Sequence, residues 1–483
     1  MSFVSNEFLL FLLATWVLFV ACRPSYRVPL LIGASFVFYA TWSIPFIGVI
    51  LLTTTVDYLA SKAIYTNSSR DFRKAAMFGA IAVNLAVLAF FKYFNFFLDA
   101  NFQLLSILGL NSPLPRHMEI LLPLGISYYT FEAISYVVDV YRGGKPAPTW
   151  WDYSFYIMYF PHLISGPIVR FKELWSQYSL PIELPSLKRL GKGLELIVLG
   201  YLFKIAFANN AALLSDPLYA NPMKHTALET YIAVLAFAVQ LYFDFMGYTH
   251  IARGVSLLFN IELPLNFNHP YNANSLANFW QRWQISLSRW LHDYVFVPLG
   301  GARKSLSRTM LAVFLTLLIA GIWHGAGWTY VVLGAYYGSL VALYHGYRRF
   351  RRSILGPRER EIVQFPVYKC VMYSLTFASI IFSSVLFRAP SVKTQFMVAA
   401  QLTRIGDLSS ELLRSLAMGN LTPLALLIIL MLCLISGPSV AAIYDRLFRP
   451  LPYWLKWHTA TAAVIVCWIF CAIDTPPFIY FQF

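Results

Sequence analysis

Residues 309–327 read TMLAVFLTLLIAGIWHGAG, and this stretch places one titratable ring, His324, inside apolar membrane-type sequence. A polar ring left unpaired in hydrocarbon costs several kcal/mol, so ionisable residues at membrane depth face a bundle interior or a wet cavity. The ordinary pKa of histidine, about 6.5, lets it accept and return a proton near neutral pH. Two interpretations stay open here. His324 is a general base, or it is a buried structural ring hydrogen-bonded to a backbone carbonyl.

The apolar run before His324 is short. Residues 309–323 would form about 22 Å of helix, less than the ~30 Å thickness of a hydrocarbon core. The sequence therefore predicts a helix that ends inside the membrane, with His324 at its tip and with Gly325 and Gly327 leaving room for the backbone.

The composition is that of a membrane protein. Of 483 residues, 58% are hydrophobic and only 12% are charged, whereas about a quarter of the residues in a soluble domain are charged. We predict an all-α polytopic protein whose partner is the lipid bilayer. At ~20 residues per crossing there is room for about a dozen spans. The apolar stretches are 4–21, 28–43, 45–60, 75–97, 119–138, 193–212, 229–246, 309–323, 327–346, 366–387, 421–442 and 457–473.

The net charge of +15 does not indicate a nucleic-acid partner, because Lys and Arg are spread through short loops between apolar runs. Basic loops alternate with loops poor in basic residues, as the positive-inside rule requires, and this predicts that both termini lie outside the cytoplasm. The five cysteines lack the spacing of a metal or redox site. We expect no bound cofactor and no metal.

Two regions do not read as simple spans. Residues 150–170 and 247–301 combine apolar residues with prolines and polar groups. Broken or re-entrant backbone at membrane depth is tolerated only where it is buried in protein or lines a cavity. These two regions are therefore predicted to line the inside of a cavity. Two carboxylates in apolar surroundings, Glu132 and Asp244, need partners that the sequence does not identify.

Residues 279–301 combine aromatic rings and arginines at helical spacing. Arg282 and Arg289 share one face of this segment, and a set of aromatic and leucine side chains shares another: Trp280, Trp283, Leu287, Trp290, Leu291 and Tyr294. The segment is either an amphipathic helix at the membrane interface or part of a substrate path.

The order of motifs along the chain resembles the membrane-bound O-acyltransferase superfamily, and within it the alginate O-acetylase group. The residues that carry the resemblance are Leu122–Glu132, His162–Pro167, Gln240–His250, Asn266–Tyr271, Phe279–Gly301, Trp323–Gly325 and Pro477–Phe483.

The resemblance implies a ring of about 11–13 transmembrane helices, with re-entrant or broken helices around a thin centre where a cytoplasmic and an extracytoplasmic funnel meet. We expect a single membrane domain over 1–483, in a bacterial inner membrane. It would have N-terminal helices over about 1–145, a core over about 150–346 and C-terminal helices over about 366–483. His324 corresponds to the intramembrane histidine regarded as catalytic in the family.

By the same resemblance, the protein moves an acetyl group from a cytoplasmic thioester, acetyl-CoA or another acyl thioester, to an exported polysaccharide. It acts directly or through an extracytoplasmic acetyltransferase partner. Alginate, cellulose and peptidoglycan stay open as acceptors. D-alanyl, lipid or protein acylation is an alternative within the superfamily, and a transporter or a scaffold of a polymer-secretion complex is an alternative outside it.

The chain departs from the family at Gln284, where many members carry a second histidine. We expect Gln284 to take a positioning role, with Asp293 and His292 as further candidates at this second site. The basic residues Arg170, Lys172, Arg303 and Lys304 would either hold coenzyme A phosphates or only set the topology. The side chains expected to line the substrate path are Trp280, Trp283, Arg289, Trp323, Asn268 and Tyr271.

Overall fold

The computed structural model describes residues 1–110, 114–115, 117–164, 166–303, 305–447, 450–469 and 478, and all regular secondary structure among them is helical. These residues form two compact units. The first comprises Met1–Ile197 and Tyr248–Pro264, and the second comprises Val198–Gly247 and Leu265–Phe483. Two helices, α10 (Leu187–Leu202) and α12 (Ala227–Leu258), contribute residues to both units.

Six helices in the described residues are long and apolar enough to cross a membrane, and seven crossings result if the bent pair α20–α21 counts as one. The six spans are Ile44–Thr66, Arg70–Ile107, Leu187–Ala220, Ala227–Leu258, Leu306–His324 and Pro366–Arg388. The prediction of an all-α, multi-pass membrane protein is confirmed. The other predicted spans do not meet the same criteria of length and apolar sequence, although α16 (Trp328–Leu355) is a continuous helix of 28 residues. One of them, 421–442, divides at Ser436 into α21 and α22.

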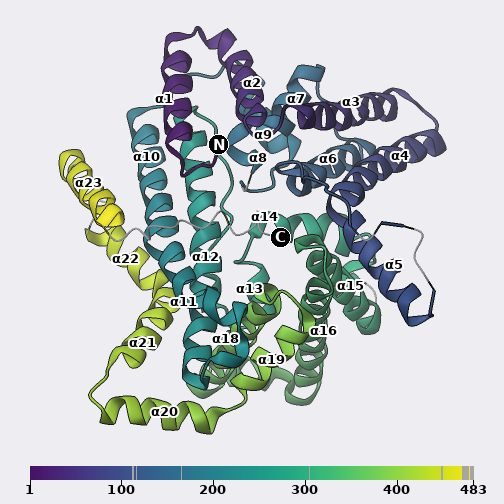
Figure 1. Cartoon of the computed structure of the whole chain (residues 1–483). Coiled ribbons are helices and arrows are strands. Elements are labelled where there is room, and N and C mark those ends of the chain that lie inside the picture. The colour runs from purple at the N-terminus through teal and green to yellow at the C-terminus, as the bar shows by residue number, and fades with distance from the viewer. Residues whose placement is uncertain are drawn as a thin grey trace. The chain divides into compact units, whose positions relative to one another are not determined.

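The first unit contains, besides its parts of α10 and α12, nine α-helices and one π-helix. They are α1 (Asn6–Ala21), α2 (Pro24–Ala40), α3 (Ile44–Thr66), α4 (Arg70–Leu88), η1 (Ala89–Tyr93), α5 (Phe94–Ile107), α6 (Ile126–Tyr141), α7 (Trp150–Met158), α8 (Phe160–Leu163) and α9 (Phe171–Tyr178) (Figure 1). The predicted span 119–138 starts as helix only at Ile126. Gly125 before it adopts φ +71°, and a Cβ there would lie 2.3 Å from the Leu163 carbonyl oxygen, so only glycine fits.

The first unit supplies a partner for one of the two buried carboxylates. The Nδ1 atom of His162 lies 3.0 Å from Oε1 of Glu132, and the Val169 N–H donates to the same oxygen at 3.1 Å. Both side chains are about 2% exposed. The broken region 150–170 therefore satisfies a carboxylate on α6, as expected of irregular backbone buried in a membrane protein.

The second unit contains, besides its parts of α10 and α12, the remaining elements. They are η2 (Phe203–Ala208), α11 (Asn209–Ala220), η3 (Pro222–Lys224), η4 (Pro270–Asn272), α13 (Leu276–Trp280), α14 (Ile285–Leu291), η5 (His292–Phe296), η6 (Gly301–Arg303), α15 (Leu306–His324), α16 (Trp328–Leu355), η7 (Gly356–Arg358), α17 (Glu359–Ile362), α18 (Pro366–Arg388), α19 (Val392–Leu402), α20 (Ile405–Ala417), α21 (Thr422–Ile435), α22 (Gly437–Leu447) and α23 (Tyr453–Ile469).

Helices α15 and α16 run antiparallel and lie side by side (Figure 1). Glycines let their backbones touch. A Cβ on Gly321 would lie 2.4 Å from the Gly334 Cα, and a Cβ on Gly338 would lie 2.8 Å from the Phe314 carbonyl oxygen. Small residues at such a seam allow the close packing that drives association of helices in a membrane. This seam holds the end of α15, and so His324, against α16.

Gly321→Ala should therefore lower the free energy of unfolding by about 1–3 kcal/mol, the usual cost of overpacking a close contact. Thermal unfolding of the detergent-purified protein measures the change. Gly33→Ala on α2 is the matched control. No described atom lies within 4 Å of a Cβ built at Gly33, and alanine favours the helix over glycine. Equal melting of the two variants would contradict the close α15–α16 contact.

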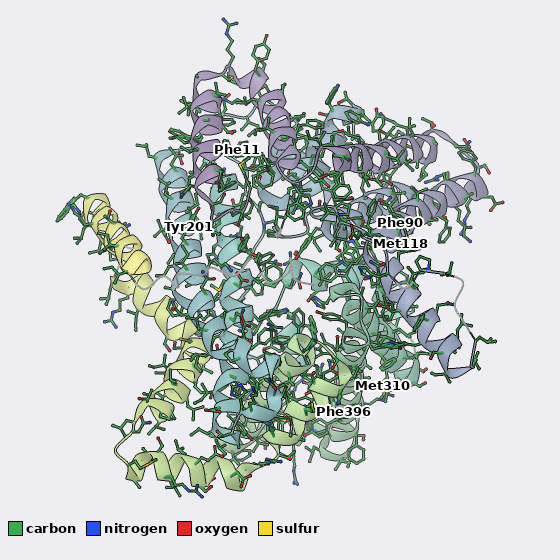
Figure 2. All side chains as sticks on the ribbon, in the orientation of Figure 1. Phe11, Phe90, Met118, Tyr201, Met310 and Phe396 are labelled. Carbon is green, nitrogen blue, oxygen red and sulfur yellow. The ribbon has the colours of Figure 1, made fainter. Side chains whose placement is uncertain are left out.

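Large apolar side chains are exposed on both units. Phe90 in the first unit is 46% exposed, and Phe396 in the second is 73% exposed (Figure 2). Large exposed apolar side chains are costly in water and are expected where lipid covers a protein.

Candidate active site

His324 is the last residue of α15 and is 5% exposed. The helix begins at Leu306, so its 19 residues span about 28 Å rather than the predicted 22 Å. The expectation of a markedly short helix is wrong, because the polar turn 306–308 is helical too. Its expected end at His324 is observed.

Position 325, directly after His324, has no room for a side chain larger than that of glycine. Its φ of −166° is extended and open to any residue, but a Cβ there would lie 2.1 Å from Cε2 of Tyr330. The Tyr330 ring therefore occupies the position beside the His324 backbone. The expectation that glycine leaves room at this point holds for Gly325, where the space is filled by an aromatic ring.

The imidazole of His324 is enclosed by aromatic rings. Trp323 lies edge-on at 5.0 Å between ring centroids, and Phe387 of α18 lies edge-on at 5.4 Å. Such packing fixes the plane of the ring and keeps bulk water from it. One edge of the site stays open to a cavity.

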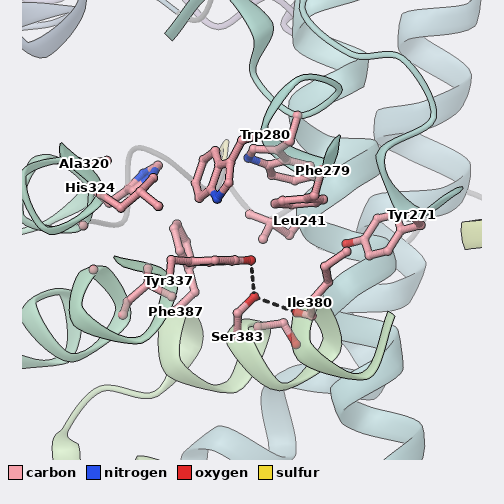
Figure 3. A pocket seen from close by; sticks show the side chains of 16 residues that line it. Leu241, Tyr271, Phe279, Trp280, Ala320, His324, Tyr337, Ile380, Ser383 and Phe387 are labelled. Carbon is pink, nitrogen blue, oxygen red and sulfur yellow. Dashed lines mark hydrogen bonds between the residues drawn. The ribbon is translucent and has the colours of Figure 1, made fainter. Parts of the chain in front are cut away.

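This cavity has a volume of about 40 Å³, and His324 is on its wall. Its lining comes from α12, α13, α15, α16 and α18, together with Tyr271 and Trp283 (Figure 3). The lining is mainly aromatic and aliphatic, with a few polar atoms. A small apolar pocket with one titratable group is the usual form of a ligand or catalytic site.

Three of the six side chains expected to line the substrate path do so: Tyr271, Trp280 and Trp283. Trp323 is not on the cavity wall and instead packs edge-on against the His324 ring. The remaining two, Asn268 and Arg289, are not part of the cavity wall. Arg289 is exposed.

Asn268 joins two parts of the irregular segment. Its N–H donates to the Arg282 carbonyl at 2.9 Å, and the Arg282 guanidinium donates to the Asn268 carbonyl at 3.3 Å. His269, next in the chain, has a left-handed φ of +46°. Burial, and to a smaller extent the Arg282 charge, lowers the pKa of the His269 imidazole.

Gln284 is 0% exposed and adopts φ +42°, which is uncommon for a residue other than glycine. Neither its amide oxygen nor its amide nitrogen has a hydrogen-bond partner among the described residues. The side chain is not on the cavity wall, although Trp283 before it is. An unsatisfied buried amide is costly, so Gln284 stays a candidate for a positioning role.

His292 and Asp293 lie away from this cavity wall. They face each other at 2.9 Å between Nδ1 and Oδ1, and their side chains are 60% and 47% exposed. The idea that His292 supplies the second imidazole of the site therefore gains no support from its position.

The expected single helical face over 279–301 is not observed. The segment is α13, a break at 281–284, α14 and the π-helix η5. The break occurs at the left-handed Gln284 and is held by Asn266. The carbonyl of Asn266 accepts from the Ile285 N–H at 2.9 Å, and its side-chain oxygen accepts from the Ser286 N–H at 3.1 Å. The break turns Trp280 and Trp283 towards the cavity.

Hydroxyl groups on the cavity wall were not anticipated from the sequence. Tyr337 of α16 and Ser383 of α18 lie 2.6 Å apart, and both line the cavity. The usable signal was the spacing Gly334-x-x-Tyr337-Gly338, which places a tyrosine beside the glycines that hold α16 against α15.

The second buried carboxylate, Asp244 of α12, is paired with Lys204 of η2. The Nζ–Oδ1 distance is 2.9 Å, and the side chains are only 1% and 2% exposed. Lys204 is the only basic residue in the apolar run 193–212, which was a readable signal of a buried partner. Lys204 lies in the π-helix η2, a type of segment frequent at functional sites.

Two sequence interpretations lie outside the described residues: the basic residue Lys304 and the terminal motif Pro477–Phe483, except Phe478. Within the described ranges, no group of three or more His, Cys, Asp or Glu side chains is arranged to hold a metal ion.

Comparison with known proteins assigns the class. Residues 145–385 match the model of the MBOAT, membrane-bound O-acyltransferase family. A probable alginate O-acetylase AlgI of Pseudomonas aeruginosa is 35% identical over 434 residues, which cover 88% of this chain and 78% of that protein. A peptidoglycan O-acetyltransferase of Helicobacter pylori is 29% identical over 418 residues, covering 80% and 76%. A teichoic acid D-alanyltransferase of Streptococcus thermophilus is 30% identical over 249 residues, covering 49% and 60%.

The all-helical fold and the comparisons therefore identify an integral membrane acyltransferase. The chain belongs to the membrane-bound O-acyltransferase family, and it is an O-acyltransferase. The predicted resemblance is confirmed. The protein is therefore an enzyme, and the alternative interpretations as a transporter or a scaffold are not supported.

Proposed function

We propose that this protein transfers an acetyl group from a thioester on the cytoplasmic side of a bacterial inner membrane to an exported polysaccharide, directly or through a partner enzyme outside the membrane. The main support is that buried His324 forms part of the wall of a small aromatic cavity. The relatives named as alginate and peptidoglycan O-acetylating enzymes support acetyl transfer and a polysaccharide acceptor.

The size of the cavity favours a short acyl group. At about 40 Å³ it has room for on the order of three water molecules. An acetyl group fits such a space, whereas a long acyl chain would have to displace the surrounding rings. This supports acetyl transfer over lipid acylation.

His324 would act as general base. Its imidazole takes the proton of the acceptor hydroxyl as the oxygen attacks the thioester carbonyl, and it then returns that proton to the leaving thiolate. General base catalysis typically contributes 10²–10⁴-fold to the rate. The aromatic enclosure of the ring supports this role, because proton transfer is sensitive to orientation and to competing water.

The donor is proposed to be acetyl-CoA or a related acetyl thioester. Basic loops on the cytoplasmic side, including Arg170, Lys172 and Arg303, would attract its phosphates. In this arrangement both termini lie outside the cytoplasm, where the acceptor polymer and a partner acetyltransferase would meet the protein. We propose a polymer of the alginate type as acceptor, by analogy with the Pseudomonas aeruginosa relative.

Purified protein in nanodiscs, supplied with acetyl-labelled coenzyme A and a uronate oligosaccharide, should label the oligosaccharide. A D-alanyl thioester should give no transfer, although one relative is named as a D-alanyltransferase. Transfer of D-alanyl in preference to acetyl would overturn the proposed donor.

A further inference from the structure

The reaction needs a hydrogen-bond donor for the oxyanion that forms on the thioester carbonyl. Because this charge develops in an apolar site that excludes water, it requires a hydrogen-bond donor that is already in position. The sequence suggested the Gln284 amide for this task, but that side chain is not part of the cavity wall. The donor has to be sought among the polar groups that are.

Two of the four hydroxyl groups on the wall donate to backbone carbonyls and make no bond to another lining side chain. Tyr271 donates to the Ala238 carbonyl at 3.0 Å, and Ser384 donates to the Ile381 carbonyl at 2.6 Å. Tyr337 and Ser383 differ, because they are bonded to each other at 2.6 Å. They are the pair of lining hydroxyls whose proton arrangement can change.

We propose that the Tyr337 hydroxyl donates a hydrogen bond to the oxyanion at this site. In the resting state the same hydroxyl donates to the Ser383 oxygen. This inference rests on the proposed acyl transfer at His324 and adds a second catalytic residue to it.

The packing of α15 and α16 directs the two side chains towards the same space. Gly321 and Gly334 are in backbone contact. His324 follows the first by three residues, and Tyr337 follows the second by three. Because the helices are antiparallel, the two Cα atoms are offset by about 9 Å along the helix axes.

Side chains on a helix tilt towards its N-terminus. In this antiparallel pair, His324 therefore leans towards the level of Tyr337, and Tyr337 leans towards the level of His324. Both residues line the cavity, and in Figure 3 the Tyr337 hydroxyl points to Ser383. A thioester carbonyl held there would present its carbon to the nucleophile at His324 and its oxygen to the phenol.

The Tyr337 ring is fixed by its neighbours. Phe279 is parallel to it at 6.1 Å, with 5° between planes, and Trp280 stands edge-on at 5.0 Å. The residue is 7% exposed. A donor that is held in place before the reaction costs no reorganisation when the charge develops.

The hydrogen of the Tyr337 hydroxyl can be redirected from Ser383 to the substrate at a small cost in free energy. Ser383 donates its single hydrogen to the Ile380 carbonyl at 2.6 Å, so in this state Tyr337 donates to Ser383. If the Ser383 hydrogen turns to the Tyr337 oxygen instead, the Tyr337 hydrogen is free for the substrate. The Ile380 carbonyl lies within α18, where backbone hydrogen bonding continues to satisfy it.

The chemical step then balances. The acceptor oxygen bonds to the acyl carbon as His324 takes its proton, and the carbonyl electrons move to the oxygen, which accepts a hydrogen bond from Tyr337. Collapse re-forms the carbonyl and breaks the carbon–sulfur bond, and the thiolate takes the proton from His324. A bond to the oxyanion is charge-assisted and about twice as strong as a neutral one, which favours the switch in the transition state.

Tyr337→Phe tests the inference, with Tyr336→Phe as the matched control. Tyr336 also lies on α16 and donates to α18, to the Ser379 carbonyl at 3.0 Å, but it does not line the cavity. With acetyl-CoA and a uronate oligosaccharide, Tyr337→Phe should lower kcat by about 10²–10³-fold, the usual loss on removal of one oxyanion donor. The KM for acetyl-CoA should change little, and Tyr336→Phe should stay close to wild type.

Replacement of Tyr337 by fluorinated tyrosines keeps the ring and varies only the acidity of the phenol, so it tests the role even if Tyr337→Phe folds poorly. At a pH where the phenol stays protonated, kcat should follow phenol acidity at position 337 and not at position 336. A kcat for Tyr337→Phe equal to that of Tyr336→Phe, or no response to fluorination, would overturn the inference. So would the same kcat loss in Trp280→Phe but not in Tyr337→Phe.

His324→Ala in the same assay separates the claim that His324 is the base from the claim that Tyr337 donates to the oxyanion. If His324→Ala abolishes transfer and Tyr337→Phe does not, only the oxyanion donor is wrong. If His324→Ala retains transfer, the proposed base is wrong whatever Tyr337 does.

Discussion

Cells that carry His324→Ala in place of the wild-type protein should export polymer with no acetyl above background, while the variant inserts and folds normally. The imidazole is 5% exposed and lies on the wall of the cavity, and alanine removes the only histidine among the described residues that line it. Loss of such a base typically costs 10²–10⁴-fold in rate. The acetyl content of the purified polymer, measured by NMR, gives the result.

His345→Ala is the matched control for this experiment. His345 is a partly exposed histidine on α16 that does not line the cavity, and its loss should leave the acetyl content unchanged. Membrane fractionation and thermal unfolding of both variants show whether folding is retained. A normal acetyl content in the His324→Ala strain would contradict the proposed mechanism.

Asp244→Ala should lower the free energy of unfolding by about 3–5 kcal/mol, the cost of leaving one charge of a buried ion pair without its partner. The Lys204 ammonium lies 2.9 Å from the Asp244 carboxylate, and both are almost fully buried. Reversible unfolding in mixed micelles measures the change. The double variant Lys204→Met/Asp244→Leu should recover most of the loss, because it removes both charges at once.

Glu262→Gln provides the comparison with an exposed pair. Arg189 and Glu262 lie 3.4 Å apart, with side chains 33% and 55% exposed, and such pairs contribute about 0–1 kcal/mol. Equal stability of Asp244→Ala and Glu262→Gln would show that the Lys204–Asp244 contact is not a buried ion pair.

The architecture was largely predictable because it depends on local properties of the chain. Six of the twelve apolar runs correspond to the six long apolar helices, and the charge-poor composition identified the membrane. The position of His324 at the end of α15 followed from the glycines after it. The broken regions 150–170 and 247–301 were also anticipated, since prolines and polar groups interrupt their apolar sequence, although residues 247–258 proved to be the continuous end of α12.

The site was less predictable because it depends on contacts between distant residues. Lys204 meets Asp244 across 40 positions and Glu132 meets His162 across 30, and no periodicity reports such pairs. The pattern over 279–301 predicted a continuous helix, since nothing in the sequence marks the left-handed backbone of Gln284. Tyr337 was missed for a similar reason. Its hydroxyl becomes significant only when α18 brings Ser383 to it.

The central claim is that His324 is the base for acetyl transfer in this cavity. The direct measurement compares the rate of acetyl transfer from labelled acetyl-CoA to a uronate oligosaccharide by purified wild-type and His324→Ala protein in nanodiscs. We predict transfer by the wild type and a rate lower by about 10²–10⁴-fold in the variant, with both proteins melting alike. Equal rates in the two proteins would contradict the claim.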